Sequence, residues 1–216
     1  MQDTTRNKLK LAFLLFIAFV PITLATITYR NAVESGGFGS TVNKGILILP
    51  PADITDLAMT DAIGIPLFKS FEELIAQIEN DDDYAPQPWL MVFVTANTCD
   101  TVCRERIHLL RQMHITLNED MPRVRRYYLN ATGASLPKET ADFFRDEFPS
   151  MGIAQGDKSK ILENLAKSNV ILDLENNNYV FFVDPVGNVM MYYEPHHPIQ
   201  DIKADLEKLL GLSSLG

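Results

Sequence analysis

The 216-residue sequence has few cysteines and few basic residues: two Cys, and 19 Lys and Arg against 28 Asp and Glu, a formal net charge of -9. Two cysteines exclude a disulfide-dense secreted scaffold. The acid excess argues against a nucleic-acid-binding protein held by phosphate contacts. We find no phosphate-binding glycine loop, nucleophilic triad signature or zinc-finger spacing. With 46% hydrophobic and 22% charged residues, the chain is expected to form one folded domain.

One long apolar run stands near the amino terminus. Residues 11–29 contain no charged side chain, and 19 residues at a helical rise of about 1.5 Å nearly match a hydrocarbon core of about 30 Å. Pro21 lies inside the run, but membrane helices tolerate proline because nearby Ser and Thr hydroxyls bond the freed backbone groups. The run therefore predicts one transmembrane helix over 11–29.

The basic residues around this run predict its orientation. Arg6, Lys8 and Lys10 precede it and only Arg30 follows, so residues 1–10 are expected to be a cytoplasmic tail. The prediction is a single-pass protein of the inner (plasma) membrane with its main domain in the periplasm or another extracytoplasmic space.

The alternative is a cleaved signal peptide, although no A-x-A-like site follows cleanly. Either alternative exports the rest of the chain to an oxidising compartment. A lipoprotein anchor is disfavoured because no cysteine follows the apolar run. Residues 30–45 include a Gly-rich polar stretch and are expected to be a tether, followed by the exported domain over 46–216.

Hydrophobic periodicity and turn residues predict an α/β order in the exported domain. The run at 89–95 has the pattern of a central strand buried on both faces. Pro50 and Pro51 are expected to stop the first strand, and Ser70 to cap the first helix. The expected strands are 45–51, 89–95, 123–129, 179–183 and 189–193, the last two forming a hairpin; the expected helices are 71–79, 99–118, 136–148, 158–167 and 199–210.

The two cysteines are four residues apart, at the turn between the central strand and the following helix. Asn97 and Thr98 are candidate caps, so Cys99 would lie at the positive helix end, which favours a thiolate. Cys103 lies one turn later on the same face. The pair could act as a reversible dithiol, hold a soft ion such as Cu(I), or form a static disulfide. A loop this short removes little unfolded-state entropy, which weakens a purely stabilising role.

The histidines and methionines offer further candidate ligands. His114 shares the apolar stripe of its helix and is expected to be a core residue. His196 and His197 form a doublet after the hairpin; they are expected to be solvated, with a metal site as the alternative. The methionines lie in apolar runs and are expected to fill the core.

Three segments carry a family resemblance: NKGILILPPADITDL, CDTVCRERIHLLRQ and VDPVGNVMMYYEP. With the anchor, they resemble the Sco/SenC proteins, and more closely a Sco-related, single-span family associated with terminal oxidases. This resemblance implies a thioredoxin-like domain with a central mixed sheet flanked by helices. It also implies that the domain handles copper, or the redox state of cysteines, at the copper site of cytochrome c oxidase.

The sequence departs from the Sco pattern at two places. No proline stands beside Cys99 or Cys103, and residues 175–178 occupy the place of the copper-binding histidine. A third copper ligand would therefore have to come from His196 or His197. An ordinary thioredoxin would have Cys-x-x-Cys and a cis-proline before the corresponding strand, and neither is present.

Three functions follow. The leading hypothesis is a membrane-anchored accessory factor that contacts a terminal oxidase subunit or its assembly factors. It would act by thiol-disulfide exchange or by handling Cu(I), with Cys99 as the attacking and Cys103 as the resolving thiol. The second is a non-catalytic tethered interaction module with a static disulfide. The third is a general periplasmic disulfide reductase.

Overall fold

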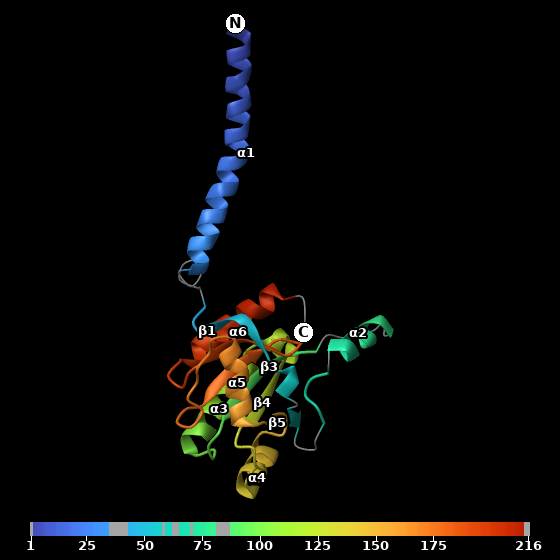
Figure 1. Ribbon diagram of the computed structural model, residues 1–216. Coiled ribbons are helices and arrows are strands. Elements are labelled where there is room, and N and C mark those ends of the chain that lie inside the picture. Colours follow the sequence, from blue (N-terminus) through green and yellow to red (C-terminus); the bar gives the residue numbers. More distant parts are fainter. Residues whose placement is uncertain are drawn as a thin grey trace. The chain divides into compact units, whose positions relative to one another are not determined.

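The computed structural model describes residues 2–34, 43–57, 59–61, 65–69, 71–80 and 87–213 (Figure 1). The chain divides into two units, residues 1–42 and residues 43–216. Each unit is described by itself.

The first unit contains the helix α1 (Gln2–Glu34). Its segment Phe13–Asn31 is long and apolar enough to cross a membrane, as the sequence predicts. Pro21 lies within the helix. Thr23 Oγ1 donates to Phe19 O at 3.0 Å and Thr26 Oγ1 to Ile22 O at 2.8 Å. These hydroxyls are satisfied within the helix itself, as an apolar environment requires.

The boundary of the expected tether differs in the structure. Because α1 continues to Glu34, the first residues of the expected tether at 30–45 are helical. Residues 35–42 of that tether lie outside the described residues.

The second unit is built on one mixed sheet with the strand order β1-β7-β6-β3-β4-β5-β2. The neighbours β3, β4 and β5 are parallel, whereas the other pairs are antiparallel. The strands are β1 (Ile46–Asp53), β2 (Thr60–Asp61), β3 (Trp89–Thr95), β4 (Val124–Asn130), β5 (Gly152–Gln155), β6 (Tyr179–Val183) and β7 (Asn188–Tyr193).

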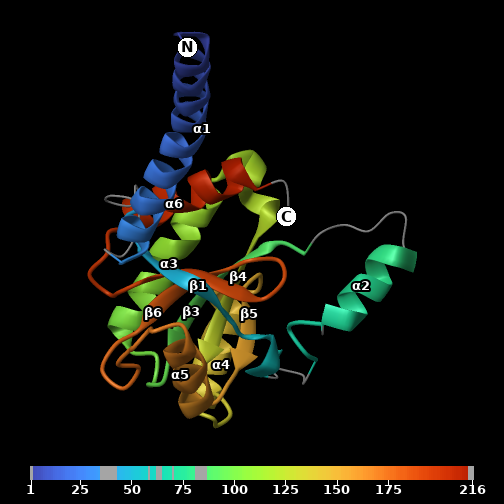
Figure 2. The ribbon, with the colours of Figure 1, turned by 45° about the horizontal axis from the view of Figure 1, so that its top comes forward.

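Helices cover both faces of this sheet. Side chains of α3, α4 and α6 pack into one hydrophobic core, and those of α5 into the other. Figure 2 shows α3 and α6, which contact each other, on the same side of the sheet. The helices are α2 (Phe71–Asn80), α3 (Thr101–Ile115), α4 (Lys138–Glu147), α5 (Lys158–Lys167) and α6 (Ile199–Leu212), with short 3-10 turns at Thr55–Leu57 and Asn118–Arg123.

The central strand β3 explains how the cores are organised. Its side chains alternate: Trp89, Met91 and Phe93 enter the core under α3, whereas Leu90, Val92 and Val94 enter the core under α5. All seven residues are buried, so the prediction of a strand buried on both faces is confirmed. Met91, Met113 and Met191 are buried, which confirms the core role expected for those methionines, whereas Met121 is 39% exposed and the same expectation is wrong there.

The prediction that Pro50 and Pro51 stop the first strand is wrong. β1 runs through both prolines to Asp53. This strand is at the edge of the sheet, where a missing backbone N–H does not break a central ladder. Its register against β7 shifts between Leu47 and Ala52. The expected cap Ser70 lies outside the described residues.

His114 is a core residue, as the sequence predicts. Its side chain is buried, and Nε2 lies 2.8 Å from Val124 O and 3.1 Å from Met121 O. Burial lowers its pKa from the ordinary value of 6.5, and the charge of Arg126 lowers it further, although the hydrogen bonds to Val124 and Met121 act in the opposite direction. The folded domain therefore keeps this imidazole neutral.

Acidification is expected to destabilise the domain through His114. The unfolded chain takes up the proton near pH 6.5, before the folded state does, so stability is full above this pH and is lost as the pH falls below it. The slope is at most about 1.4 kcal/mol per pH unit. Urea unfolding between pH 7.5 and 5.5, followed by the emission of Trp89, the only tryptophan, measures it. His114→Gln should flatten the slope, and the exposed His108→Gln should not; equal slopes in both variants would contradict the assignment.

Candidate functional site

The two cysteines flank the start of α3. Cys99 lies in the loop that follows β3, and Cys103 lies in the first turn of the helix. The N-cap is Asp100, whose Oδ1 accepts the Cys103 N–H at 2.9 Å. The expectation of Asn97 or Thr98 as the cap is therefore wrong. The Asn97 side chain instead donates to the carbonyl of Glu175, in the loop before β6.

Cys99 and Cys103 form a disulfide, and their Cα atoms are 5.2 Å apart. Both residues are buried, with exposed fractions of 1% and 5%, and both belong to the core under α3. In this oxidised state neither sulfur is a thiolate, so binding of a soft metal at the pair requires reduction. The disulfide, one of the three states that the sequence left open for the pair, is the one seen in the structure.

A pocket of about 220 Å³ lies against Cys99, and Cys103 is not among its lining residues. Its polar lining includes Thr98, Asn130 and Thr132, from the ends of β3 and β4 and the loops that follow. Asn130 Nδ2 donates to Ala134 O at 2.7 Å, and Thr132 Oγ1 donates to Asn130 Oδ1 at 2.8 Å. These bonds fix the loop that faces Cys99. The pocket therefore lies on the Cys99 side of the disulfide.

Tyr128 also lines this pocket and is almost fully buried. Burial raises the pKa of its hydroxyl to about 12. The hydroxyl therefore stays protonated over the physiological pH range. Tyr128 therefore brings no charge to the lining of the pocket.

Arg104 connects the disulfide loop to α4. Its Nε donates to Cys99 O at 3.4 Å, and its Nη2 pairs with Glu139 Oε1 at 2.8 Å. The guanidinium also lies over the ring of Phe143, 4.8 Å from the centroid. This contact set holds the carbonyl of Cys99 in place and puts one positive charge beside the disulfide.

Residues 175–178, at the place of the Sco histidine, also lie close to the cysteine loop. Glu175 O accepts the Asn97 side chain, and Glu175 Oε1 pairs with Lys158 Nζ at 2.6 Å. The segment 175–178 therefore lies beside the cysteine loop, and the carboxylate of Glu175 is already paired. Sequence patterns gave no signal for this contact.

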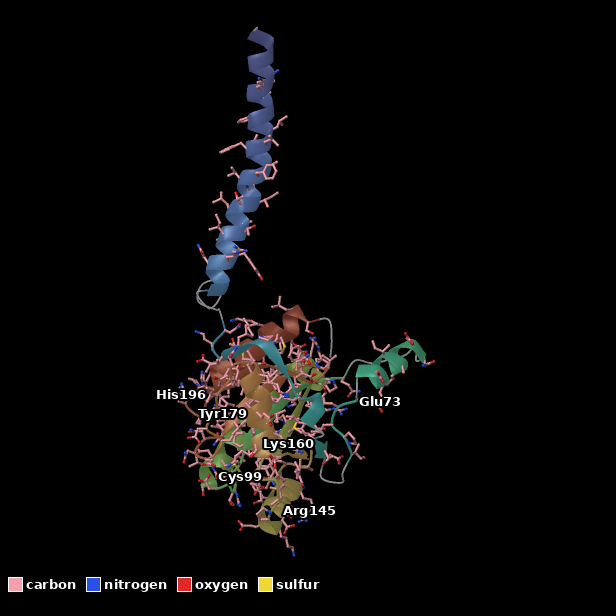
Figure 3. All side chains as sticks on the ribbon, viewed as in Figure 1. Glu73, Cys99, Arg145, Lys160, Tyr179 and His196 are labelled. Carbon is pink, nitrogen blue, oxygen red and sulfur yellow. A yellow bond between two sulfur atoms is a disulfide. The ribbon has the colours of Figure 1, made fainter. Side chains whose placement is uncertain are left out.

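His196 and His197 form a separate group with Glu194, a residue that the sequence patterns did not identify as a candidate ligand. One ligand atom from each of the three residues lies within 4.8 Å of the others, and among the described residues no cysteine belongs to this group. Because β6 is antiparallel to both β3 and β7, the strands β3 and β7 end at the same edge of the sheet. Figure 3 labels Cys99 and His196, which come from different loops at this edge.

Comparison with known proteins gives a family and several remote structures. The family model described as "Transmembrane-like, thioredoxin-like, C-terminal domain" matches residues 89–213. No curated protein sequence matches the chain. The predicted thioredoxin-like α/β fold, with a mixed sheet flanked by helices and preceded by an apolar helix, is confirmed.

Among solved structures, copper-bound ScoI of Bradyrhizobium japonicum is 13% identical, with a TM-score of 0.44, over 69% of this chain and 94% of that one. A SCO1/SenC family lipoprotein of Bacillus anthracis is 16% identical, with a TM-score of 0.44, over 70% and 90%. The thioredoxin domain of a Bacteroides vulgatus thiol-disulfide oxidoreductase is 12% identical, with a TM-score of 0.43, over 74% and 97%. These likenesses are remote.

Proposed function

Since the chain belongs to the transmembrane-like, thioredoxin-like C-terminal domain family, we propose that it is a membrane-anchored thiol-disulfide exchange protein whose reacting groups are Cys99 and Cys103. The observation that carries this proposal is the disulfide at the strand-to-helix turn, with a pocket of about 220 Å³ against Cys99. A disulfide with a purely stabilising role would not need a pocket beside it.

The exchange step follows from the position of the pocket. In the reduced protein the Cys99 thiolate attacks a sulfur of the partner disulfide and forms a mixed disulfide, while the partner's other sulfur leaves as a thiolate. The Cys103 thiolate then attacks Cys99 Sγ, which closes the disulfide and releases the partner as a dithiol. Two electrons and two protons pass to the partner, and an external dithiol donor restores the reduced protein.

The proposed partner is a terminal oxidase subunit or one of its assembly factors, and this rests on the sequence resemblance to the Sco/SenC-related family. The proposed orientation has the amino terminus in the cytoplasm and the second unit in the periplasm, from the excess of Arg6, Lys8 and Lys10 before the apolar run. In this proposal Cu(I) is an ion that the protein carries to its partner and is not a resident cofactor. After reduction the two cysteine sulfurs are ligands that Cu(I) prefers.

The burial of the disulfide favours a second candidate function, the tethered interaction module with a static bond. Both cysteines are at most 5% exposed and pack in the core, and buried thiols are generally inert. The two candidates differ in the free energy of reduction, because an inert structural disulfide has a reduction potential below about -300 mV.

The midpoint potential of the pair is expected to lie above about -300 mV. Because the two cysteines are only four positions apart, the disulfide closes a short loop, which adds little entropic resistance to reduction. Equilibration of the full chain in detergent with dithiothreitol redox buffers, followed by alkylation of free thiols, measures this potential. A lower potential would favour the static module over exchange.

A further inference from the structure

The turn after β7 carries three ligand-type side chains that the disulfide site does not use. Glu194, His196 and His197 each offer a ligand atom, and these atoms lie within 4.8 Å of one another. We propose that these three residues form a binding site for a divalent first-row transition cation such as Cu²⁺ or Zn²⁺. The site is independent of the proposed function at the cysteines.

The backbone of this turn is held at both ends. His197 N donates to Glu194 O at 3.1 Å, which closes the turn. The next residue, Pro198, is the N-cap of α6. Arg106 of α3 donates through Nη2 to His197 O at 2.7 Å. Because strand, helix and guanidinium all fix the backbone, bringing the three side chains together on a cation would order only the side chains themselves.

The side chains are close to one another and open to solvent. His196 Nδ1 lies 3.3 Å from Glu194 Oε2, and the two imidazole rings are stacked with centroids 4.5 Å apart. The His196 side chain is 71% exposed and that of Glu194 38%. A hydrated cation therefore reaches the group without opening the core. Small side-chain rotations bring the donor atoms to metal–ligand distances of about 2.0–2.2 Å.

His197 is the most constrained of the three ligands. Its ring meets the ring of Tyr193 edge-on, with centroids 5.6 Å apart, and the Tyr193 hydroxyl donates to the buried Asp205 at 3.0 Å. The Glu194 N–H donates to His197 Nδ1 at 3.0 Å, so the neutral ring carries its proton on Nε2. A cation at Nδ1 replaces that bond directly. A cation at Nε2 displaces the proton there to Nδ1, and a protonated Nδ1 can no longer accept the Glu194 N–H. In either case the bond from the Glu194 amide is lost when the cation binds.

The donor set determines the class of cation. Two imidazole nitrogens and one carboxylate oxygen suit Cu²⁺, Zn²⁺ and Ni²⁺, whereas Cu(I) prefers sulfur. Among these divalent ions Cu²⁺ binds most tightly at a given nitrogen and oxygen site. Three protein ligands leave positions open for water, so the site takes up and releases its ion readily. The acidic chain, with a net charge of -9, also favours a cation.

Electron paramagnetic resonance with Cu²⁺ tests the site on the full, oxidised chain in detergent. Because both cysteines are in the disulfide, no thiol reduces or binds the added Cu²⁺. We expect one Cu²⁺ per chain, with superhyperfine coupling to two imidazole nitrogens. His196→Ala and His197→Ala should each weaken binding at least about tenfold, because losing even a second-shell partner has such an effect.

His108→Ala is the matched control, because His108 is exposed on α3 and does not belong to the group. The affinity of this variant for Cu²⁺ should equal that of the unchanged chain. The ¹⁵N amide resonance of Glu194 should shift when Zn²⁺ is added. His196→Ala removes only an exposed side chain, so it keeps the test valid even where His197→Ala perturbs the turn. Wild-type affinity in His196→Ala, or no nitrogen coupling in the unchanged chain, would overturn the proposal.

Discussion

Replacing Asp205 by alanine is expected to lower the free energy of unfolding of the second unit by about 3–5 kcal/mol, because three hydrogen bonds to its carboxylate are lost. The Asp205 carboxylate on α6 is 1% exposed. Its Oδ2 accepts the Lys44 N–H at 2.7 Å, the Gly45 N–H at 2.8 Å and the Tyr193 hydroxyl at 3.0 Å. Alanine removes all three bonds and leaves the buried Gly45 N–H without its acceptor, which is the costly case.

Urea unfolding followed by Trp89 emission measures the loss. Glu207→Ala is the matched control, because Glu207 lies on the same helix but is exposed and only pairs with Lys203 at 3.5 Å. Such a surface pair contributes about 0–1 kcal/mol. Asp205→Asn keeps an acceptor oxygen and should fall between the two. If Asp205→Ala were no less stable than Glu207→Ala, the carboxylate would have no such role.

Replacing both Cys99 and Cys103 by serine is expected to abolish exchange and to impair oxidase assembly in the membrane. The accompanying loss of stability should be only about 2 kcal/mol, because the closed loop is very short. Function should therefore fall far more than folding. The haem–copper oxidase activity of membranes measures the first effect, and Trp89 emission in urea measures the second.

The single variants separate the roles of the two sulfurs. Cys103→Ser keeps the attacking thiol at the pocket and removes the resolving one, so a mixed disulfide with the partner should accumulate on non-reducing gels. Cys99→Ser should trap far less. Normal oxidase assembly in the double variant would refute a cysteine mechanism, and efficient trapping of unrelated disulfide proteins would favour a general reductase.

The elements that the sequence predicted well are those whose pattern is local. β3 is recognisable because all of its residues are apolar or small and all are buried. The helix α3 is recognisable because Cys103, Ile107 and Leu110 fall on one face. β5 was missed because it has only four residues, Gly152–Gln155, and lies between two helices. The first strand was predicted too short because proline is tolerated in an edge strand, and the sequence alone does not show that this strand lies at the edge of the sheet.

The same distinction holds for the candidate site. The pairing of Cys99 with Cys103 follows from a spacing of four residues. In contrast, the contact of Asn97 with Glu175 joins positions 78 apart, and that of Lys44 with Asp205 joins positions 161 apart. Periodicity and capping patterns act over one or two turns of chain. They therefore carry no information about which distant loops meet at the sheet edge.

The bonds from Lys44 and Gly45 to Asp205 have a mechanical consequence for the second unit. β1 pairs on one side only, with β7, and its ladder is interrupted between Leu47 and Ala52. Such a strand would be the first to peel away when the chain is pulled from its amino-terminal end. The Asp205 carboxylate holds the backbone just before β1. A force applied there is therefore transmitted to α6 and to the core that α6 packs against. A force applied to the chain before β1 therefore has to break these two hydrogen bonds to Asp205 before β1 separates from β7.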